Sequence, residues 1–314
     1  MKNRITEILG TAYPLILGPM RLITLGEMAA AVSESGGFGQ VAASGASGEK
    51  LRSELKKARE LTDRPIGVNI PVYRPNAFEA LEIAIDMGIQ TITTSAGSPA
   101  KMMDRIKDGG LKVLHKVSSL EMGLKAQDAG VDAVIATGHE AGGHIGRDDT
   151  TTLILIPQLV DALDIPVVAA GGIGDARGLI AALALGAEGI EAGTRFLATR
   201  ECSVPDFWKQ SVVEAKGKAT LVLGEKAMPV RALSNKKALQ VSDPDKAKED
   251  ARIMEAGDKD FIESDEGVES SIIPAGQVAG LIRDIKAVAE VFPDMVADAK
   301  LLSSKIYALF KEED

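Results

Sequence analysis

The chain has 314 residues, of which 45% are hydrophobic and 26% charged, a composition typical of a folded globular protein. Its 45 acidic residues outnumber its 36 basic residues, and the net charge of -9 disfavours nucleic acid as a partner because a phosphate backbone would be repelled. No apolar run approaches the roughly 18 residues of a membrane span, and residues 1–10 lack the apolar run of a signal peptide. We therefore expect no membrane partner. The single cysteine, Cys202, cannot form an internal disulfide, and so we expect an inert thiol in a cytoplasmic protein.

Short apolar runs alternate with segments of helical period along the first two thirds of the chain. The predicted strands are 13–18, 39–42, 66–70, 91–94, 112–115, 133–136, 167–169 and 189–191. The predicted helices are 25–35, 49–60, 76–86, 98–108, 118–129, 153–162 and 176–186. This α/β pattern of eight successive strands favours a TIM (β/α)8 barrel, and an open doubly wound sheet is the alternative.

The alternation stops after residue 196. Residues 197–270 are polar, with charged stretches at 243–252 and 263–269, and they predict a helical insertion, either a lid or a small second domain. Helical periodicity returns at 275–290 and 293–310, which predicts two C-terminal helices. We therefore expect residues 1–196 and 274–314 to form the barrel and residues 197–273 to form the insertion or lid. Phe207 and Trp208, in the insertion, are expected in a core, with a pocket lid as the alternative.

Glycines follow two neighbouring predicted strands. Gly171 and Gly172 come after the seventh strand, and Gly193 and Thr194 come after the eighth. In a barrel these loops lie side by side at the C-terminal face, where backbone N–H groups and helix N-termini bind phosphate. The sequence therefore predicts a phosphorylated ligand or cofactor at these loops, and tight turns without a ligand are the alternative.

The loop after the sixth strand, residues 138–146, reads GHEAGGHIG and holds two of the three histidines. Glycine on one side of His144 and a further glycine two residues on would let a planar ligand approach the ring, and the ordinary pKa of histidine suits acid–base chemistry. A metal site is the weaker alternative because the helical H-E-x-x-H spacing is absent. We expect a catalytic or ligand-binding loop without a metal.

Three polar side chains belong to predicted strands or their ends. Asn69 could bond a heteroaromatic ring or cap a turn. His115 is expected to be a core histidine, with a ligand contact as the alternative, and Lys116 faces either an anion in the mouth or solvent.

Six segments together resemble the nitronate monooxygenase family, formerly called 2-nitropropane dioxygenases. They are 18–20 (GPM), 67–69 (GVN), 138–146 (GHEAGGHIG), 170–173 (AGGI), 193–196 (GTRF) and 275–280 (AGQVAG). The same superfamily includes the flavin-dependent enoyl-[acyl-carrier-protein] reductases of the second type and related NADH:quinone reductases. The resemblance covers nearly the whole chain and implies an FMN-binding TIM barrel.

The resemblance also implies roles for individual residues. Residues implied to contact or lie near the flavin ring are Gly18, Pro19, Met20, Asn69, Lys116, Gly142, Gly143 and Gln277. Residues implied to hold its phosphate are Gly171, Gly172, Gly193 and Thr194. His144 matches the catalytic histidine of the family.

Two activities follow from the resemblance. In a nitronate monooxygenase, His144 would act as a base or hold the anionic substrate, and O2 would be the electron acceptor. In an enoyl reductase, NAD(P)H would be the reductant, and His144 would orient the enoyl thioester or the nicotinamide. Arg21 departs from the family pattern and leaves substrate choice open, since it could hold a phosphate or form an outward salt bridge. The alternative from another functional class is a flavin-free barrel that binds a phosphate. A homodimer is a possible assembly.

Overall fold

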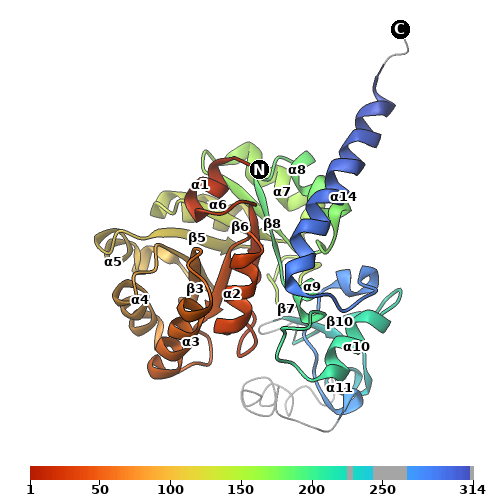
Figure 1. Cartoon of the computed structure of the whole chain (residues 1–314), viewed down its shortest axis with the longest axis horizontal. Coiled ribbons are helices and arrows are strands. Elements are labelled where there is room, and N and C mark those ends of the chain that lie inside the picture. Colours follow the sequence, from red (N-terminus) through yellow and green to blue (C-terminus); the bar gives the residue numbers. More distant parts are fainter. Residues whose placement is uncertain (225–228, 243–266, 312–314) are drawn as a thin grey trace.

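Eight parallel strands form the centre of the computed structural model, which describes residues 1–224, 229–242 and 267–311 (Figure 1). The strands are β1 (Leu15–Leu17), β2 (Gly39–Ala42), β3 (Ile66–Pro71), β4 (Thr91–Ser95), β5 (Lys112–Val117), β6 (Ala133–Thr137), β8 (Val167–Ala170) and β9 (Gly189–Ala192). Their order is β1-β9-β8-β6-β5-β4-β3-β2, and a parallel bridge between Ile16 and Phe38 brings the two edges of the sheet together. The predicted TIM barrel is confirmed.

Helices cover the outside of this barrel. They are α2 (Gly26–Glu34), α3 (Gly48–Leu61), α4 (Ala77–Asp86), α5 (Met103–Asp108), α6 (Leu120–Ala129), α7 (Thr152–Ala162) and α8 (Ala176–Ala184). Several begin at a side chain that accepts a free backbone N–H, as Ser47, Ser119 and Asp175 do. The predicted helix 98–108 is instead a 3-10 turn, η1 (Pro99–Lys101), followed by α5, because the Met102 N–H bonds the Pro99 carbonyl three residues back.

The interior of the barrel has an apolar lower half and a polar upper half. Side chains alternate along a strand, so Phe38 and Leu114 face the interior below Gln40 and Lys116. The lower half is a closed cluster of Ile5, Leu9, Ile16, Phe38, Leu114, Ala133, Ile135, Val168 and Ala170. Ile5 and Leu9 come from α1 (Arg4–Leu9), a helix that the sequence analysis did not predict and that plugs the bottom of the barrel.

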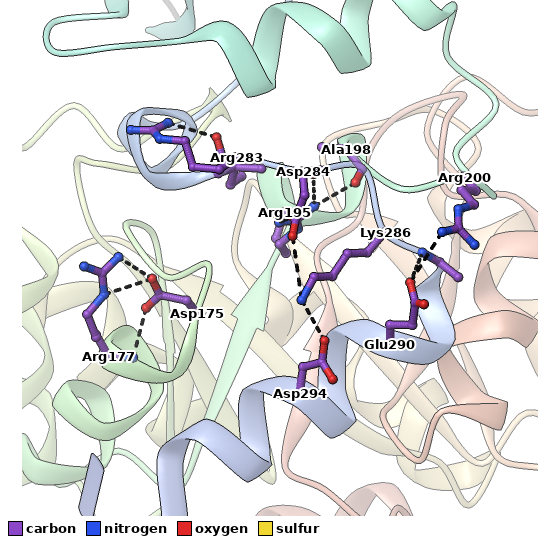
Figure 2. Close-up of polar contacts among 12 residues, drawn as sticks. Asp175, Arg177, Arg195, Ala198, Arg200, Arg283, Asp284, Lys286, Glu290 and Asp294 are labelled. Carbon is purple, nitrogen blue, oxygen red and sulfur yellow. Dashed lines mark hydrogen bonds and ion pairs between the residues drawn. The ribbon is translucent and has the colours of Figure 1, made fainter. Parts of the chain in front are cut away.

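The C-terminal region differs from the prediction of two helices. Only η3 (Gln277–Leu281) forms within 275–290, and the chain then runs extended to a parallel bridge between Thr199 and Lys286. Arg195 stabilises this extended path (Figure 2). Its guanidinium donates to the Asp284 carboxylate at 2.8 Å and to the Asp284 main-chain oxygen at 2.6 Å. Glycines at 276 and 280 also disfavour a regular helix, so the prediction was wrong there.

The second predicted helix starts earlier than expected. It is α14 (Val288–Leu309), with Pro293 inside it, and Lys286 donates to Asp294 at 2.6 Å just before its first turn (Figure 2). This helix packs against α8 and α2 and so takes the place of the eighth helix of the barrel. No helix of the described ranges is long and apolar enough to cross a membrane.

Residues 197–273 contain strands as well as helices, so their prediction as helical was incomplete. The short helix α9 (Thr194–Leu197) leads into this segment, whose described elements are α10 (Asp206–Glu214), β10 (Thr220–Leu223), β11 (Val230–Leu233), α11 (Lys236–Val241) and η2 (Val268–Ser270). β10 and β11 form an antiparallel ribbon, and β7 (Gly143–His144) adds to its edge. Trp208 is 1% exposed and is a core residue, as predicted, while the charged stretch 243–252 and most of 263–269 lie outside the described residues.

Candidate active site

A chain of buried hydrogen bonds crosses the upper interior of the barrel. Gln40 Nε2 donates to the Leu17 carbonyl at 2.7 Å, and Thr93 Oγ1 donates to Gln40 Oε1 at 2.6 Å. Asn69 Nδ2 in turn donates to Thr93 Oγ1 at 2.9 Å. Asn69 is therefore not a turn cap. The row of hydrogen bonds fixes the orientation of its amide within β3.

A buried ion pair lies in the same polar half. The Lys116 ammonium on β5 donates to Glu191 Oε1 on β9, so Lys116 is neither a solvated loop lysine nor an isolated cation. Burial raises the pKa of Glu191, and the charge of Lys116 acts in the opposite direction. The sequence analysis missed Glu191, although a glutamate inside an apolar run directly before Gly193 was a visible signal.

His115 belongs to the core rather than to the mouth. It is 2% exposed, and its Nδ1 lies 2.8 Å from Thr94 Oγ1. Burial lowers the pKa of His115 to about 4, so the ring is neutral near neutral pH. The prediction of a core histidine is confirmed. Cys202 is likewise buried, and burial raises the pKa of its thiol, as expected for an unreactive cysteine.

The glycines at the mouth form two groups. A side chain would collide with backbone at Gly142, where an added Cβ would lie 2.4 Å from the Gly276 nitrogen, and it would be tight against backbone at Gly18 and Gly171, at 3.0 Å. At Gly193, by contrast, the nearest atom is Met20 Sδ at 3.9 Å, and no atom of the described residues lies within 4 Å of a Cβ at Gly143. Packing therefore requires the first group, whereas the second leaves space beside the backbone that a ligand can occupy.

The loops after β8 and β9 meet the C-terminal segment. Gly171 and Gly172 have φ of 97° and 74°, values that favour glycine, and an added Cβ at Gly172 would touch only Glu140 side-chain atoms, at 3.6 Å or more. Thr194 Oγ1 accepts the Gly276 N–H at 2.9 Å. These contacts bring the predicted phosphate loops together with the segment that carries Gln277.

Two further predicted residues lie around these loops. The Met20 N–H donates to Thr24 Oγ1 at 3.1 Å, and this contact closes the turn that follows Gly18 and Pro19. The Gln277 side chain is exposed, and its N–H donates to the Glu140 carbonyl at 2.9 Å, next to the contact between Gly142 and Gly276.

His144 lies on β7 and remains accessible. Gly143 pairs with Arg231 and His144 with Val230, so β11 of the insertion holds this part of the loop in an extended form. The surrounding protein, and then the charges of Arg74 and Arg21, lower the pKa of His144. The ring is therefore neutral at neutral pH and can accept a proton.

Arg21 and Arg74 come from the loops after β1 and β3. Arg21 lies over Gly45, where an added Cβ would be 2.8 Å from its Nε, and so it points along the mouth toward the loop after β2. The Arg74 guanidinium lies 4.9 Å from the centre of the Tyr73 ring. Both arginines act on His144, which makes this side of the mouth positive in a chain of net charge -9.

The Glu140 carboxylate and the main chain at His139 stabilise the histidine loop. Glu140 Oε2 accepts the Thr152 N–H at 2.9 Å and the Thr152 hydroxyl at 3.0 Å, so it caps the start of α7. The His139 carbonyl accepts from Arg231 Nε at 3.1 Å. Within the described ranges no group of three metal-ligating side chains occurs.

Among the described residues, the barrel interior also has buried polar atoms without a hydrogen-bond partner, including Thr137 Oγ1 and Glu191 Oε2. Both residues pair with Ala170 on β8, Thr137 from β6 and Glu191 from β9. Such atoms are usually satisfied by water or a ligand. A heteroaromatic ring with polar edges, joined to a phosphate, fits this polar half and the open glycines above it.

Comparison with known proteins agrees with this geometry. A family model described as nitronate monooxygenase matches residues 2–298. A probable nitronate monooxygenase of Staphylococcus saprophyticus is 32% identical over 281 residues, which cover 75% of this chain and 79% of that protein. The (3aS,4S,5R,7aS)-5-hydroxy-7a-methyl-1-oxo-octahydro-1H-indene-4-carboxyl-CoA dehydrogenase of Rhodococcus jostii is 35% identical over 236 residues, or 74% of this chain and 66% of its own.

Two solved structures are similar over almost the whole chain. FabK from Thermotoga maritima has a TM-score of 0.94 and 34% identity, and the match covers 99% of this chain and 100% of FabK. A nitroalkane oxidase from Streptomyces ansochromogenes has a TM-score of 0.79 and 25% identity, with 97% and 100% covered. The family model over residues 2–298 and the 32% identical relative show that this chain belongs to the nitronate monooxygenase family and is a flavin-dependent oxidoreductase.

Proposed function

We propose that this protein binds FMN at the carboxyl ends of the barrel strands and oxidises alkyl nitronates with molecular oxygen. The ring would rest on the polar half of the interior, near Asn69 and Lys116, and the phosphate would lie on residues 171–172 and 193–194. When bound, FMN supplies the redox chemistry by accepting electrons from the substrate and passing them to O2. The protein supplies position, charge and a base.

The observation that carries the choice of substrate is the charge around His144. A nitronate is an anion, so the positive side of the mouth formed by Arg21 and Arg74 would attract it to an accessible ring. Burial, and then the charges of Arg74 and Arg21, lower the pKa of His144 and so favour the neutral ring. A neutral ring can take a proton from a neutral nitroalkane or donate its own N–H to the nitronate. His144 is therefore the proposed catalytic residue.

The second candidate is NAD(P)H-dependent reduction of an enoyl thioester, and a quinone is a further electron acceptor within the superfamily. Its support is the whole-chain likeness to FabK, an enoyl-ACP reductase, and to a relative named for a CoA thioester. In that reaction Arg21 and Arg74 would face the phosphate groups of a carrier or a dinucleotide.

We also propose that residues 1–196 and 274–314 form the barrel and that 197–273 form a subdomain at its mouth. The support is the pairing of β11 with β7, which connects the insertion directly to the strand that carries His144. Access of a substrate to His144 would then depend on residues of the insertion as well as on the barrel.

One experiment separates the candidates. Purified protein is loaded with FMN, and its visible absorbance is followed without oxygen after addition of an alkyl nitronate, NADH or NADPH. We expect the nitronate to bleach the flavin and the nicotinamides to leave it oxidised. Bleaching by NADH or NADPH, followed by reoxidation with an enoyl thioester, would establish the second candidate instead. A protein that takes up no FMN contradicts both and leaves a phosphate-binding barrel.

A further inference from the structure

Glu191 is a buried charge that the proposed reaction does not use. Its side chain is 4% exposed, whereas that of its partner Lys116 is 21% exposed. Lys116 therefore reaches toward the mouth, and Glu191 lies behind it inside the barrel. Oε1 of Glu191 accepts from Lys116, and Oε2 has no hydrogen-bond partner within the part of the chain that the structure describes.

A carboxylate in this position is costly. Removing it from water is strongly unfavourable, and a single ammonium repays that cost incompletely. Glutamine has nearly the same shape and could still accept from Lys116 without the cost of a buried charge. A buried ion pair at the base of a ligand site is typical of a group kept for function.

The effect of Glu191 on a ligand above it is electrostatic. Lys116 alone would present a full positive charge to the mouth. With Glu191 behind it, the pair presents a dipole with little net charge. A ligand that gains negative charge during the reaction is stabilised strongly by the lone cation and weakly by the pair.

We propose that Glu191 tunes the flavin: it positions the Lys116 ammonium and offsets its charge, so that bound FMN is harder to reduce than it would be beside Lys116 alone. This inference rests on the proposed binding of FMN near Lys116. Two-electron reduction of FMN with uptake of one proton adds one negative charge to the ring, which the ion pair stabilises less than a free ammonium does. Electrons then pass more readily from the reduced ring to an acceptor such as O2.

The test measures the fraction of reduced FMN in equilibrium with a redox dye, without oxygen. At the potential that leaves wild-type FMN half reduced, Glu191→Gln should raise the ratio of reduced to oxidised FMN about tenfold. For a two-electron couple, tenfold corresponds to a shift of about 30 mV. Lys116→Met should change the ratio in the opposite direction.

A matched control is Glu188→Gln. Glu188 lies just before β9 at the opposite end of the barrel, where Arg4 Nε donates to it at 2.8 Å. The variant removes the same charge from a half-buried ion pair at the far end of the barrel rather than from the interior next to Lys116, so we expect the wild-type ratio.

The possible outcomes separate the two proposals. FMN-loaded Glu191→Gln with the wild-type ratio would overturn the tuning role and leave the proposed function intact. If Glu191→Gln does not fold, Glu191→Met decides, because it removes the same charge: a higher ratio than in the wild type supports the inference, and the wild-type ratio overturns it. A wild-type protein that binds no FMN overturns the proposed function itself.

Discussion

The lower half of the barrel interior is lined by apolar side chains, whereas the upper half is lined by polar and charged ones. The lower half is closed by the α1 plug and by apolar side chains such as Phe38 and Leu114, and every member of this cluster is at most 3% exposed. The upper half holds an ion pair, a chain of amides and hydroxyls, and buried polar atoms without partners. The lower half therefore stabilises the fold by apolar packing. The upper half keeps buried polar and charged groups that are unfavourable for folding but that a ligand can satisfy.

The strongest way to test this division is His144→Ala, which removes the proposed base above the polar half. We expect kcat/KM for the nitronate to fall by about 10² to 10⁴, because general base catalysis contributes that much, while FMN stays bound. Visible absorbance checks the FMN, and oxygen uptake checks turnover. His139→Ala in the same loop is the control and should retain activity. Unaltered turnover in yellow His144→Ala protein would remove this histidine from the mechanism.

The lower half can be tested with Leu114→Ala. The side chain is fully buried among Ile135, Val168 and their neighbours, so the truncation leaves a cavity. We expect a loss of about 2 to 5 kcal/mol in the free energy of unfolding, measured by urea denaturation. The dissociation constant of FMN should stay close to the wild-type value. If the variant lost FMN without losing stability, the division between the two halves would be wrong.

Gly193→Asp tests the top of the upper half. The backbone at Gly193 has negative φ and space beside it, so a side chain fits without strain. The new carboxylate would face the proposed phosphate, and we expect the dissociation constant of FMN to rise about tenfold to a hundredfold by charge repulsion. Gly193→Ala fills the same space without charge and should bind FMN nearly normally, as fluorescence titration can show. Equal affinity of the two variants would place the phosphate elsewhere.

The barrel could be predicted from the sequence because its strands are short apolar runs whose glycine-rich ends recur at regular intervals. The plug α1 was missed because six residues carry too little periodicity, and the 275–290 helix failed because its path depends on Arg195, which lies some 90 residues away in the chain. The strands of the insertion were missed for a similar reason. β11 is held by partners from β10 and from the loop at residue 143, and local propensity does not contain those contacts.

The site could be predicted in outline because its glycines and His144 follow strand ends, where a barrel collects them. The sequence could not tell which glycines are open and which are needed for packing, since that depends on atoms from distant segments. It also could not pair Lys116 with Glu191, which are 75 residues apart and meet only once the barrel closes.

The smallest effect is expected for Arg74→Met, which tests whether an arginine at the mouth of the barrel lowers the pKa of His144. Arg74 lowers the pKa of His144, so its removal should raise that pKa toward the ordinary value for histidine. Because the neutral ring is the active form, the acidic limb of the kcat/KM profile should move to higher pH, with activity near pH 8 least affected. The chain has only three histidines, so NMR can follow the His144 titration directly, with His144→Gln assigning the signal. Lys300→Met removes an exposed charge on α14 and should leave the titration unchanged. A titration of His144 that is the same with and without Arg74 would show that Arg74 does not contribute to its pKa.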